Sequence, residues 1–464
     1  MGNLLTSLNL AANSMDVIEQ AIGVVQNNVT NASTPGYVLQ TSTTLARLFD
    51  PQTGATGGIQ FGPVQSARNQ FAEQAVRSQN SLLGTASSAA SSLSSLQQDF
   101  SISGTSGIPA ALSTLYSAFS SWSTTPTDTT AQQQVLSAAQ QVAIAFNDAA
   151  SSVTQLGTST DQQIQSTVSQ INGLASQIQQ INVQIRNGGA KDAGLDAQLN
   201  NDLEQLSNLT SIDVHYQSDG TAEVLMGGQT PLVIGATQNQ LSLTFTTPAN
   251  PANPDAPPAA TITGSDGQDV TNTVTQGTLA GLLTFRNVTL AGIRGDSQNA
   301  GSLNQLAQAF ATQVNSLVVP ASGIPLFTTS GNAATSAATF AINPNMTGAQ
   351  LVASSATSSN GTADQLAQLA TASDPTLGMG YTDFYANIAS AVGTQESAAS
   401  SNQSSQQDLL TQAQSARSQV SGISLNQQAT LLIQFQQAYE ASAETVTTIN
   451  TMLTALLTMT NGVA

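Results

Sequence analysis

Residues 4–29 read LLTSLNLAANSMDVIEQAIGVVQNNV. Apolar residues recur in this stretch at alternating steps of four and three positions, and we call this set the N-terminal seam: Leu4, Leu8, Ala11, Met15, Ile18, Ile22, Val25 and Val29. This heptad spacing is typical of a helix that packs lengthwise against another helix. Only Asp16 and Glu19 are charged, so salt bridges would not maintain the helix in solvent. We therefore expect the segment to need a helical partner.

A second seam of the same kind lies near the end of the chain. This C-terminal seam consists of Leu432, Phe435, Tyr439, Val446, Ile449, Leu453 and Leu456, and Ser442 occupies its one polar position. Because the two seams are similar in length, the simplest arrangement joins the N- and C-terminal helices in one coiled coil. The alternative is two separate amphipathic helices docked on a globular core.

The composition excludes several functions. The chain has 464 residues, enough for two to four domains. Its 26 acidic and 8 basic residues give a net charge of −18, so nucleic acid is not an expected partner. Only 7% of residues are charged, against about 25% in an average domain, and the surface must therefore consist largely of Ser, Thr, Asn and Gln. The absence of cysteine excludes disulfides and thiol catalysis.

Membrane insertion and a cleaved signal peptide are not expected either. No apolar run approaches the roughly 18 residues of a membrane span. The first residues, MGNLLTSLNL, lack the basic region that begins a signal peptide. If the protein is exported, it leaves the cell with its N-terminus uncleaved.

The segments between the seams alternate between helical and extended patterns. Apolar spacing predicts helices over 66–100, 112–122, 131–185 with a break at Gly157, 195–206, 277–317, 364–372, 383–392 and 397–420. From Ser211 the period changes to two, which predicts strands over 212–216, 222–226, 232–234, 241–245 and 260–263. Pro35-Gly36 should end the first helix near Asn31.

We therefore predict a mainly α fold with a small inserted β-domain. The terminal helices and the extended loop after the first of them form one domain, residues 1–65 with 400–464. Long helices form a second, rod-like domain, residues 66–210 with 276–399. The inserted β-domain covers residues 211–275.

No constellation predicts catalysis, a metal site or a cofactor site. His215 is the only histidine, and it alternates with apolar residues on a strand, so we expect its side chain to face solvent. Asp266 and Asp269 lie in a predicted loop as solvated charges. The one tryptophan, Trp122, fits an apolar helical stripe as a core residue.

Two terminal motifs resemble those of the bacterial flagellar axial proteins, which include rod, hook and hook-associated proteins. NNVTNASTPGY at 27–37 resembles their N-terminal signature, and the segment 424–443 resembles their C-terminal one. The matching positions are Asn28, Asn31, Pro35, Gly36, Tyr37, Phe435, Gln436 and Tyr439. GTLAGLLTFRN at 277–287 and the segment 202–228 narrow the resemblance to the hook-associated protein 1 family.

This resemblance implies a structural, non-enzymatic protein of the flagellum, at the junction between hook and filament. It implies export through the flagellar type III apparatus and self-assembly into the axial lattice. The implied partners are the hook protein, a second junction protein and an export chaperone. Another axial protein of the hook or distal rod is the nearest alternative, and a secreted adhesin with coiled-coil ends is a more distant one.

The first prediction concerns order at the N-terminus. The apolar area of the N-terminal seam is too small to offset the backbone entropy of two dozen residues on its own. Amides in 4–29 should therefore exchange rapidly with deuterium in the lone chain and be protected in assembled protein. Unprotected amides in assembled subunits would contradict folding on assembly.

Overall fold

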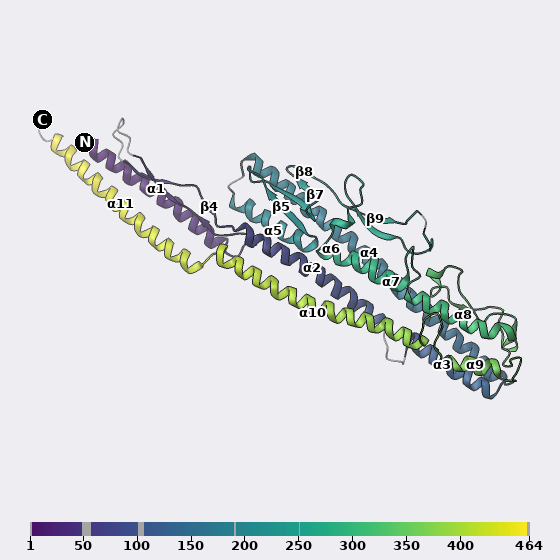
Figure 1. Ribbon diagram of the computed structural model, residues 1–464. Coiled ribbons are helices and arrows are strands. Elements are labelled where there is room, and N and C mark those ends of the chain that lie inside the picture. The colour runs from purple at the N-terminus through teal and green to yellow at the C-terminus, as the bar shows by residue number, and fades with distance from the viewer. Residues whose placement is uncertain (1, 49–56, 101–105, 190–191, 250, 462–464) are drawn as a thin grey trace.

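The computed structural model describes residues 2–48, 57–100, 106–189, 192–249 and 251–461. The molecule is an elongated, mainly helical rod with both ends of the chain at one tip (Figure 1). Helices α1 (Gly2–Thr30) and α11 (Leu425–Asn461) lie side by side at this tip. The mainly α fold with small sheets agrees with the sequence prediction.

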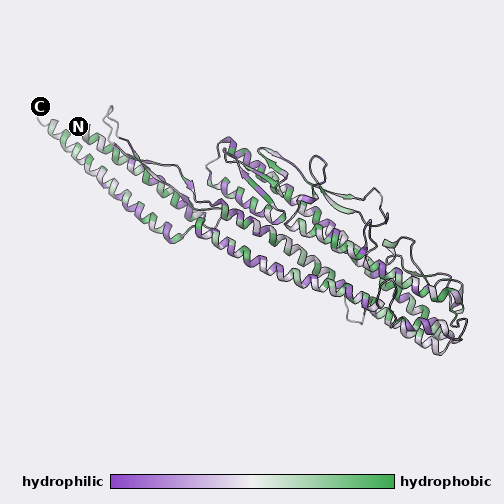
Figure 2. Ribbon diagram, in the orientation of Figure 1, coloured by the Kyte–Doolittle hydropathy of each residue, from purple (hydrophilic) through white to green (hydrophobic). Residues whose placement is uncertain are grey.

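Two long helices connect this tip to the rest of the rod. Helix α2 (Gln70–Asp99) begins at Asn69, whose side chain accepts a hydrogen bond from the Ala72 amide. Helix α10 (Tyr381–Ser421) packs along α2 and is continuous, although the sequence pattern predicts two separate helices there. Figure 2 shows hydrophilic and hydrophobic residues interspersed along α10.

The longest helix is α4 (Thr129–Gln184), which packs on α3 (Gly107–Thr124) and α5 (Ala193–Leu209). The predicted break at Gly157 is wrong, since α4 runs through it without interruption. A Cβ at Gly157 would meet the Arg294 guanidinium. The glycine therefore permits close packing of Arg294 rather than a change of direction. A short π-helical turn, η1 (Ile185–Gly189), follows α4.

The strands between residues 212 and 263 lie along the C-terminal half of α4. A four-stranded antiparallel sheet has the order β5 (Ile212–Tyr216), β6 (Ala222–Met226), β7 (Thr230–Ile234) and β8 (Thr237–Gln238). A hairpin of β9 (Ser242–Thr246) and β10 (Ala259–Thr263) follows, and then the short turn η2 (Thr271–Thr273). Side chains from the sheet, α4, α5 and α6 (Thr278–Thr284) form one apolar core. The sheet therefore shares its core with the helices.

The predicted helix over 277–317 is wrong as a single element. It divides into α6, the π-helical turn η3 (Phe285–Thr289), α7 (Leu290–Arg294) and α8 (Ser302–Ser322). The interruption is bounded by Gly295 and Gly301, with φ of 91° and 80°, values that side chains rarely adopt. Asp296 stabilises the loop by accepting the amides of Gln298 and Asn299.

Short elements complete the fold. Near the N-terminus β1 (Gln40–Thr41) pairs with β4 (Gln65–Ser66), and β2 (Thr44–Arg47) pairs with β3 (Gly58–Phe61). Towards the far tip lie β11 (Phe327–Thr328), η4 (Ala333–Thr335), β12 (Ala341–Ile342), η5 (Gly348–Gln350) and α9 (Gly361–Gln368).

An aromatic cluster anchors the far tip. Phe310 of α8 is fully buried, and its ring lies 5.1 Å from that of Tyr381 and 5.7 Å from that of Phe327. Tyr116 of α3 packs edge-on against Phe310. Trp122 is fully buried, as the sequence predicts. This cluster joins the start of α10 to α3 and α8.

Phe310→Ala should lower the free energy of unfolding by about 3–5 kcal/mol, because it removes a ring from a packed core. The matched control is Phe71→Ala, since the Phe71 side chain is 84% exposed and its loss should change stability by less than about 0.5 kcal/mol. Denaturant unfolding of both variants measures the difference. Equal effects would contradict the assignment of Phe310 to the core.

Candidate assembly interface

The C-terminal seam lies on the protected face of α11. Ile449 is buried, and the other seam residues are half-buried except Leu456, which is 38% exposed. Most residues between seam positions are exposed, including Ile433 and Met452. The seam therefore follows the face of α11 that contacts α1.

The protected face of α1 differs from the N-terminal seam. Leu4, Leu8, Ala11, Met15, Ile18 and Ile22 are half-buried and Val25 is buried. Val29 is exposed, so its placement in a buried seam is wrong. The fully buried positions are instead Val17, Ala21, Val25 and Asn28. The reason is that α1 packs against both α11 and strand β3, and two neighbours cover a wider face than one heptad seam.

Asn28 joins the two ends of the chain. Its Nδ2 donates to the Gln40 carbonyl at 2.8 Å and to Gln428 Oε1, in α11, at 3.0 Å. Its Oδ1 accepts the Gln40 amide at 2.9 Å and the Tyr37 hydroxyl at 3.3 Å. The side chains of Asn28 and Gln428 are almost wholly buried. Asn28 thus fixes the end of α1, the chain that leaves it and the start of α11.

The Pro35-Gly36-Tyr37 turn lies against α5. Gly36 has a φ of 76°, and a Cβ there would meet the backbone carbonyl of Ala197. Only glycine fits both the conformation and the contact. Asn31 accepts a hydrogen bond from Thr34 Oγ1 at 3.1 Å within the same turn, and burial raises the pKa of the Tyr37 hydroxyl. The N-terminal part of the family motif, residues 28–37, therefore forms the connection between α1 and the rod.

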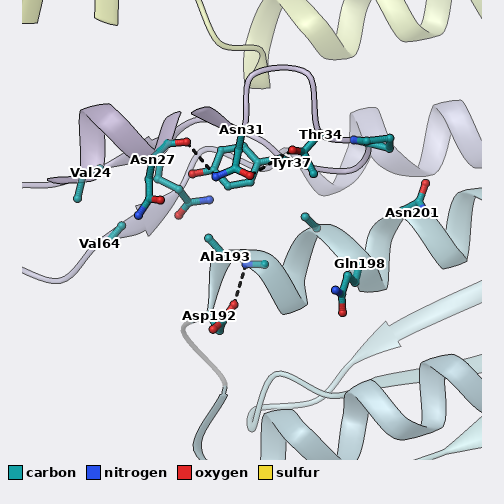
Figure 3. Close-up of a pocket in the computed structure, with 14 residues that line it drawn as sticks. Val24, Asn27, Asn31, Thr34, Tyr37, Val64, Asp192, Ala193, Gln198 and Asn201 are labelled. Atoms are coloured by element: carbon teal, nitrogen blue, oxygen red, sulfur yellow. Dashed lines mark hydrogen bonds between the residues drawn. The ribbon is translucent and has the colours of Figure 1, made fainter. Parts of the chain in front are cut away.

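A cavity of about 780 Å³ lies beside this turn (Figure 3). Asn27, Asn31 and Tyr37 line one side, and Gln198 and Asn201 of α5 line the other. Asp192 at its edge is engaged as the cap of α5, where it accepts the Gly194 amide at 2.7 Å. The lining is rich in amide side chains, which suits hydrogen bonding to a protein neighbour more than chemistry.

A cluster of ion pairs also stabilises the joint between α1 and the rod, which consists of the turn at 35–37 and the helices that contact it. Arg68 pairs with Glu73 at 2.7 Å and with Asp196 at 2.8 Å, and it donates to the Gly36 carbonyl at 2.6 Å. Arg417 of α10 pairs with Glu73 at 3.0 Å and with Glu204 at 2.6 Å. Burial lowers the pKa of Arg417, but the hydrogen bonds and negative charges of Glu204 and Glu73 together raise it by more. The pKa of Arg417 is therefore raised overall.

No local sequence pattern predicts this cluster. Its members are far apart in the chain, and the scarcity of basic residues was the only available signal. The cluster ties α2, α5 and α10 to the turn that follows α1. Because Arg68 and Glu73 are nearly buried, the pairs fix geometry at the joint.

The described residues contain no group of three acidic or histidine side chains placed to bind a metal. His215 is exposed on β5, as predicted. Asp266 and Asp269 cap their own loop by accepting the amides of Gln268 and Thr271. No helix in the described ranges has the length and apolar character that a membrane crossing requires.

The model of the flagellar hook-associated protein FlgK helical domain matches residues 93–333, more than half of the chain. The chain belongs to this family. The flagellar basal body rod FlgEFG protein C-terminal model matches residues 414–459, which include most of α11. A search of curated proteins finds no match.

Among the solved structures that match is the flagellar hook junction protein FlgK from Burkholderia pseudomallei, which shares the fold with a TM-score of 0.62 at 18% identity. The alignment covers 74% of this chain and 99% of that one. The chain is thus a component of the flagellum with a mainly helical fold.

Asn28→Ala should loosen the joint, because it leaves the buried Gln40 amide and Gln428 side chain without partners. Such a loss costs about 1–3 kcal/mol. Hydrogen exchange at the Gln40 backbone amide in assembled protein measures it, and protection should fall in Asn28→Ala. Asn27→Ala is the control, since the Asn27 side chain is exposed. Unchanged protection in Asn28→Ala would contradict the role of this side chain.

Proposed function

We propose that this chain is the structural subunit of the junction between the flagellar hook and filament, and that it assembles through the paired helices α1 and α11. The observation that carries the proposal is the family match over 93–333. The shape of the molecule supports the proposal. Both ends of the chain lie at one tip, where α1 and α11 would contact neighbouring subunits while the rest of the rod projects away.

The paired helices keep apolar surface for neighbouring subunits. Leu5 on α1 and Ile433, Met452 and Leu457 on α11 are each more than half exposed. Apolar side chains gathered on one helix pair are typical of a protein interface. In the proposed assembly, the N-terminal seam without Val29, the C-terminal seam and the family motif residues hold the pair together, and these exposed residues contact the next subunit.

The proposal includes partners and a route. The hook protein and a second junction protein would adjoin the assembled subunits, and an export chaperone would bind the chain before assembly. The chain would leave the cell unfolded through the flagellar type III apparatus, with its N-terminus uncleaved. It would act without a cofactor or catalytic step.

We also propose that the chain is organised in three domains. Residues 1–65 with 400–464 would form the assembly domain, residues 66–210 with 276–399 the rod, and residues 211–275 an inserted β-domain on its outer side. Helix α10 passes continuously through residue 400, so the first two domains would be mechanically coupled.

Charged substitutions on α1 test the proposal. Ile18→Glu combined with Ile22→Glu should abolish polymerisation and motility while the sheet of β5–β8 stays folded, because both half-buried side chains would become charged. Gln20→Glu combined with Gln26→Glu is the control, since both side chains are exposed on the same helix and the pair gains the same two charges. Normal assembly of the double variant, measured by sedimentation, would contradict the proposal.

Deletion of 425–464 separates the proposal from a secreted adhesin. A junction subunit without α11 should lose polymerisation and motility altogether. An adhesin would keep ligand binding through its β-domain. Motility of cells that express the truncated chain decides between the two, and full motility would contradict the proposal.

A further inference from the structure

A polar pocket of about 480 Å³ lies between α2 and the edge strand β5, apart from the turn described above. Helix α2 contributes Gln74, Arg77 and Ser78, and β5 contributes Asp213 and His215. Arg77 is nearly buried, whereas the other four side chains are exposed around it. The pocket therefore has a cationic floor and a polar rim.

Arg77 lacks the partner that a buried guanidinium needs. It is only 7% exposed, and its Nη1 makes no hydrogen bond to any described residue. Glu73, one helical turn earlier, pairs through Oε1 with Arg68 and through Oε2 with Arg417. Leaving a buried charge without a partner costs free energy, and because Arg77 also lines the pocket, an anion there would lie beside its guanidinium and offset part of that cost.

The pocket suits a carboxylate. The planar fork of an arginine matches a carboxylate in a bidentate pair, and Gln74, Ser78 and His215 offer further donors at the rim. Asp213 is the acidic residue of the lining, and its Oδ2 lies beside Gly228, at the β6–β7 turn. Its negative charge should weaken the binding of an anion, but its carboxylate does not itself pair with Arg77.

The net charge of the chain indicates where such a carboxylate could come from. At −18, copies of this chain repel one another, and acidic residues outnumber basic ones by 26 to 8. Arg68, Arg186, Arg286 and Arg417 pair with acids of the same chain. An unpaired, preformed cationic pocket is therefore suited to an acidic side chain of another copy.

We propose that the pocket between α2 and β5 binds a carboxylate through Arg77, and that in the assembled protein this carboxylate is an Asp or Glu side chain of a neighbouring copy. The carboxylate site is argued from the pocket alone. The neighbouring copy as the source of the carboxylate rests on the proposed assembly.

The first experiment uses acetate as the probe and the unassembled full chain as the receptor. At constant ionic strength, replacing chloride by acetate should raise the melting temperature of the unsubstituted chain. Arg77→Gln should weaken acetate binding about 10–100-fold, the range expected for a hydrogen bond to a charged group. Asp213→Asn should strengthen binding, because it removes a like charge.

Arg186→Gln is the matched control, since it removes one arginine from an exposed ion pair with Asp219 and should leave the acetate response unchanged. Circular dichroism verifies that each variant is folded. If Arg77→Gln does not fold, Arg77→Lys keeps the charge, loses the planar fork and should show a reduced response. Equal acetate responses in the unsubstituted chain and a folded Arg77 variant would overturn the carboxylate site.

The second experiment tests the source of the carboxylate. Arg77→Gln should raise the subunit concentration needed for polymerisation, acetate should do the same to the unsubstituted chain, and Arg186→Gln should not. If Arg77→Gln polymerises at the same concentration as the unsubstituted chain, the proposal that a neighbouring copy supplies the carboxylate is overturned. Failure of the unsubstituted chain to polymerise at all would overturn the proposed function and this source, while the acetate result would still stand.

Discussion

The buried carboxamide of Asn28 is the contact on which the arrangement of this molecule depends. It binds Gln428 across 400 positions of sequence and Gln40 across twelve, so one side chain fixes both ends of the chain and the strand between them. An amide is suited to this role because it donates and accepts at once. Since its partners are buried, any other register of α1 against α11 would leave polar groups unpaired.

The rest of the rod extends from this joint. The ion pairs of Arg68 and Arg417 fasten the turn after α1 to α2, α5 and α10, and α10 then runs without interruption to the aromatic cluster at Tyr381. Two of the eight basic residues thus lie where helices from distant parts of the sequence meet. Away from this joint two further arginines, Arg186 and Arg286, pair with Asp219 and Asp161, and many other contacts are apolar or made by neutral side chains, which are insensitive to ionic strength.

The sequence predicts what depends on local periodicity. Heptad spacing located both terminal helices, and the change of period at Ser211 located the sheet. Local periodicity does not predict polar contacts between distant residues. Apolar spacing places Val29 in a buried seam, whereas the structure buries Asn28, which bonds to Gln428, 400 positions away. Apolar spacing does not reveal the break at Gly295, because apolar residues continue on both sides of it. It also gives no reason for Gly157, because the neighbour of this glycine, Arg294, is distant in sequence.

The pairing of the two ends is tested most directly by a distance between them in assembled protein. The chain has no cysteine, so introduced cysteines at Asn27 and Gln427, both exposed next to the buried pair, can be spin-labelled without interference. Labelled subunits are diluted into unlabelled ones, so that the measured distance lies within one chain. The account predicts a single narrow distribution of short distances by pulsed electron resonance. A broad or long distribution would show that α1 and α11 of one chain do not pair, and would contradict the account.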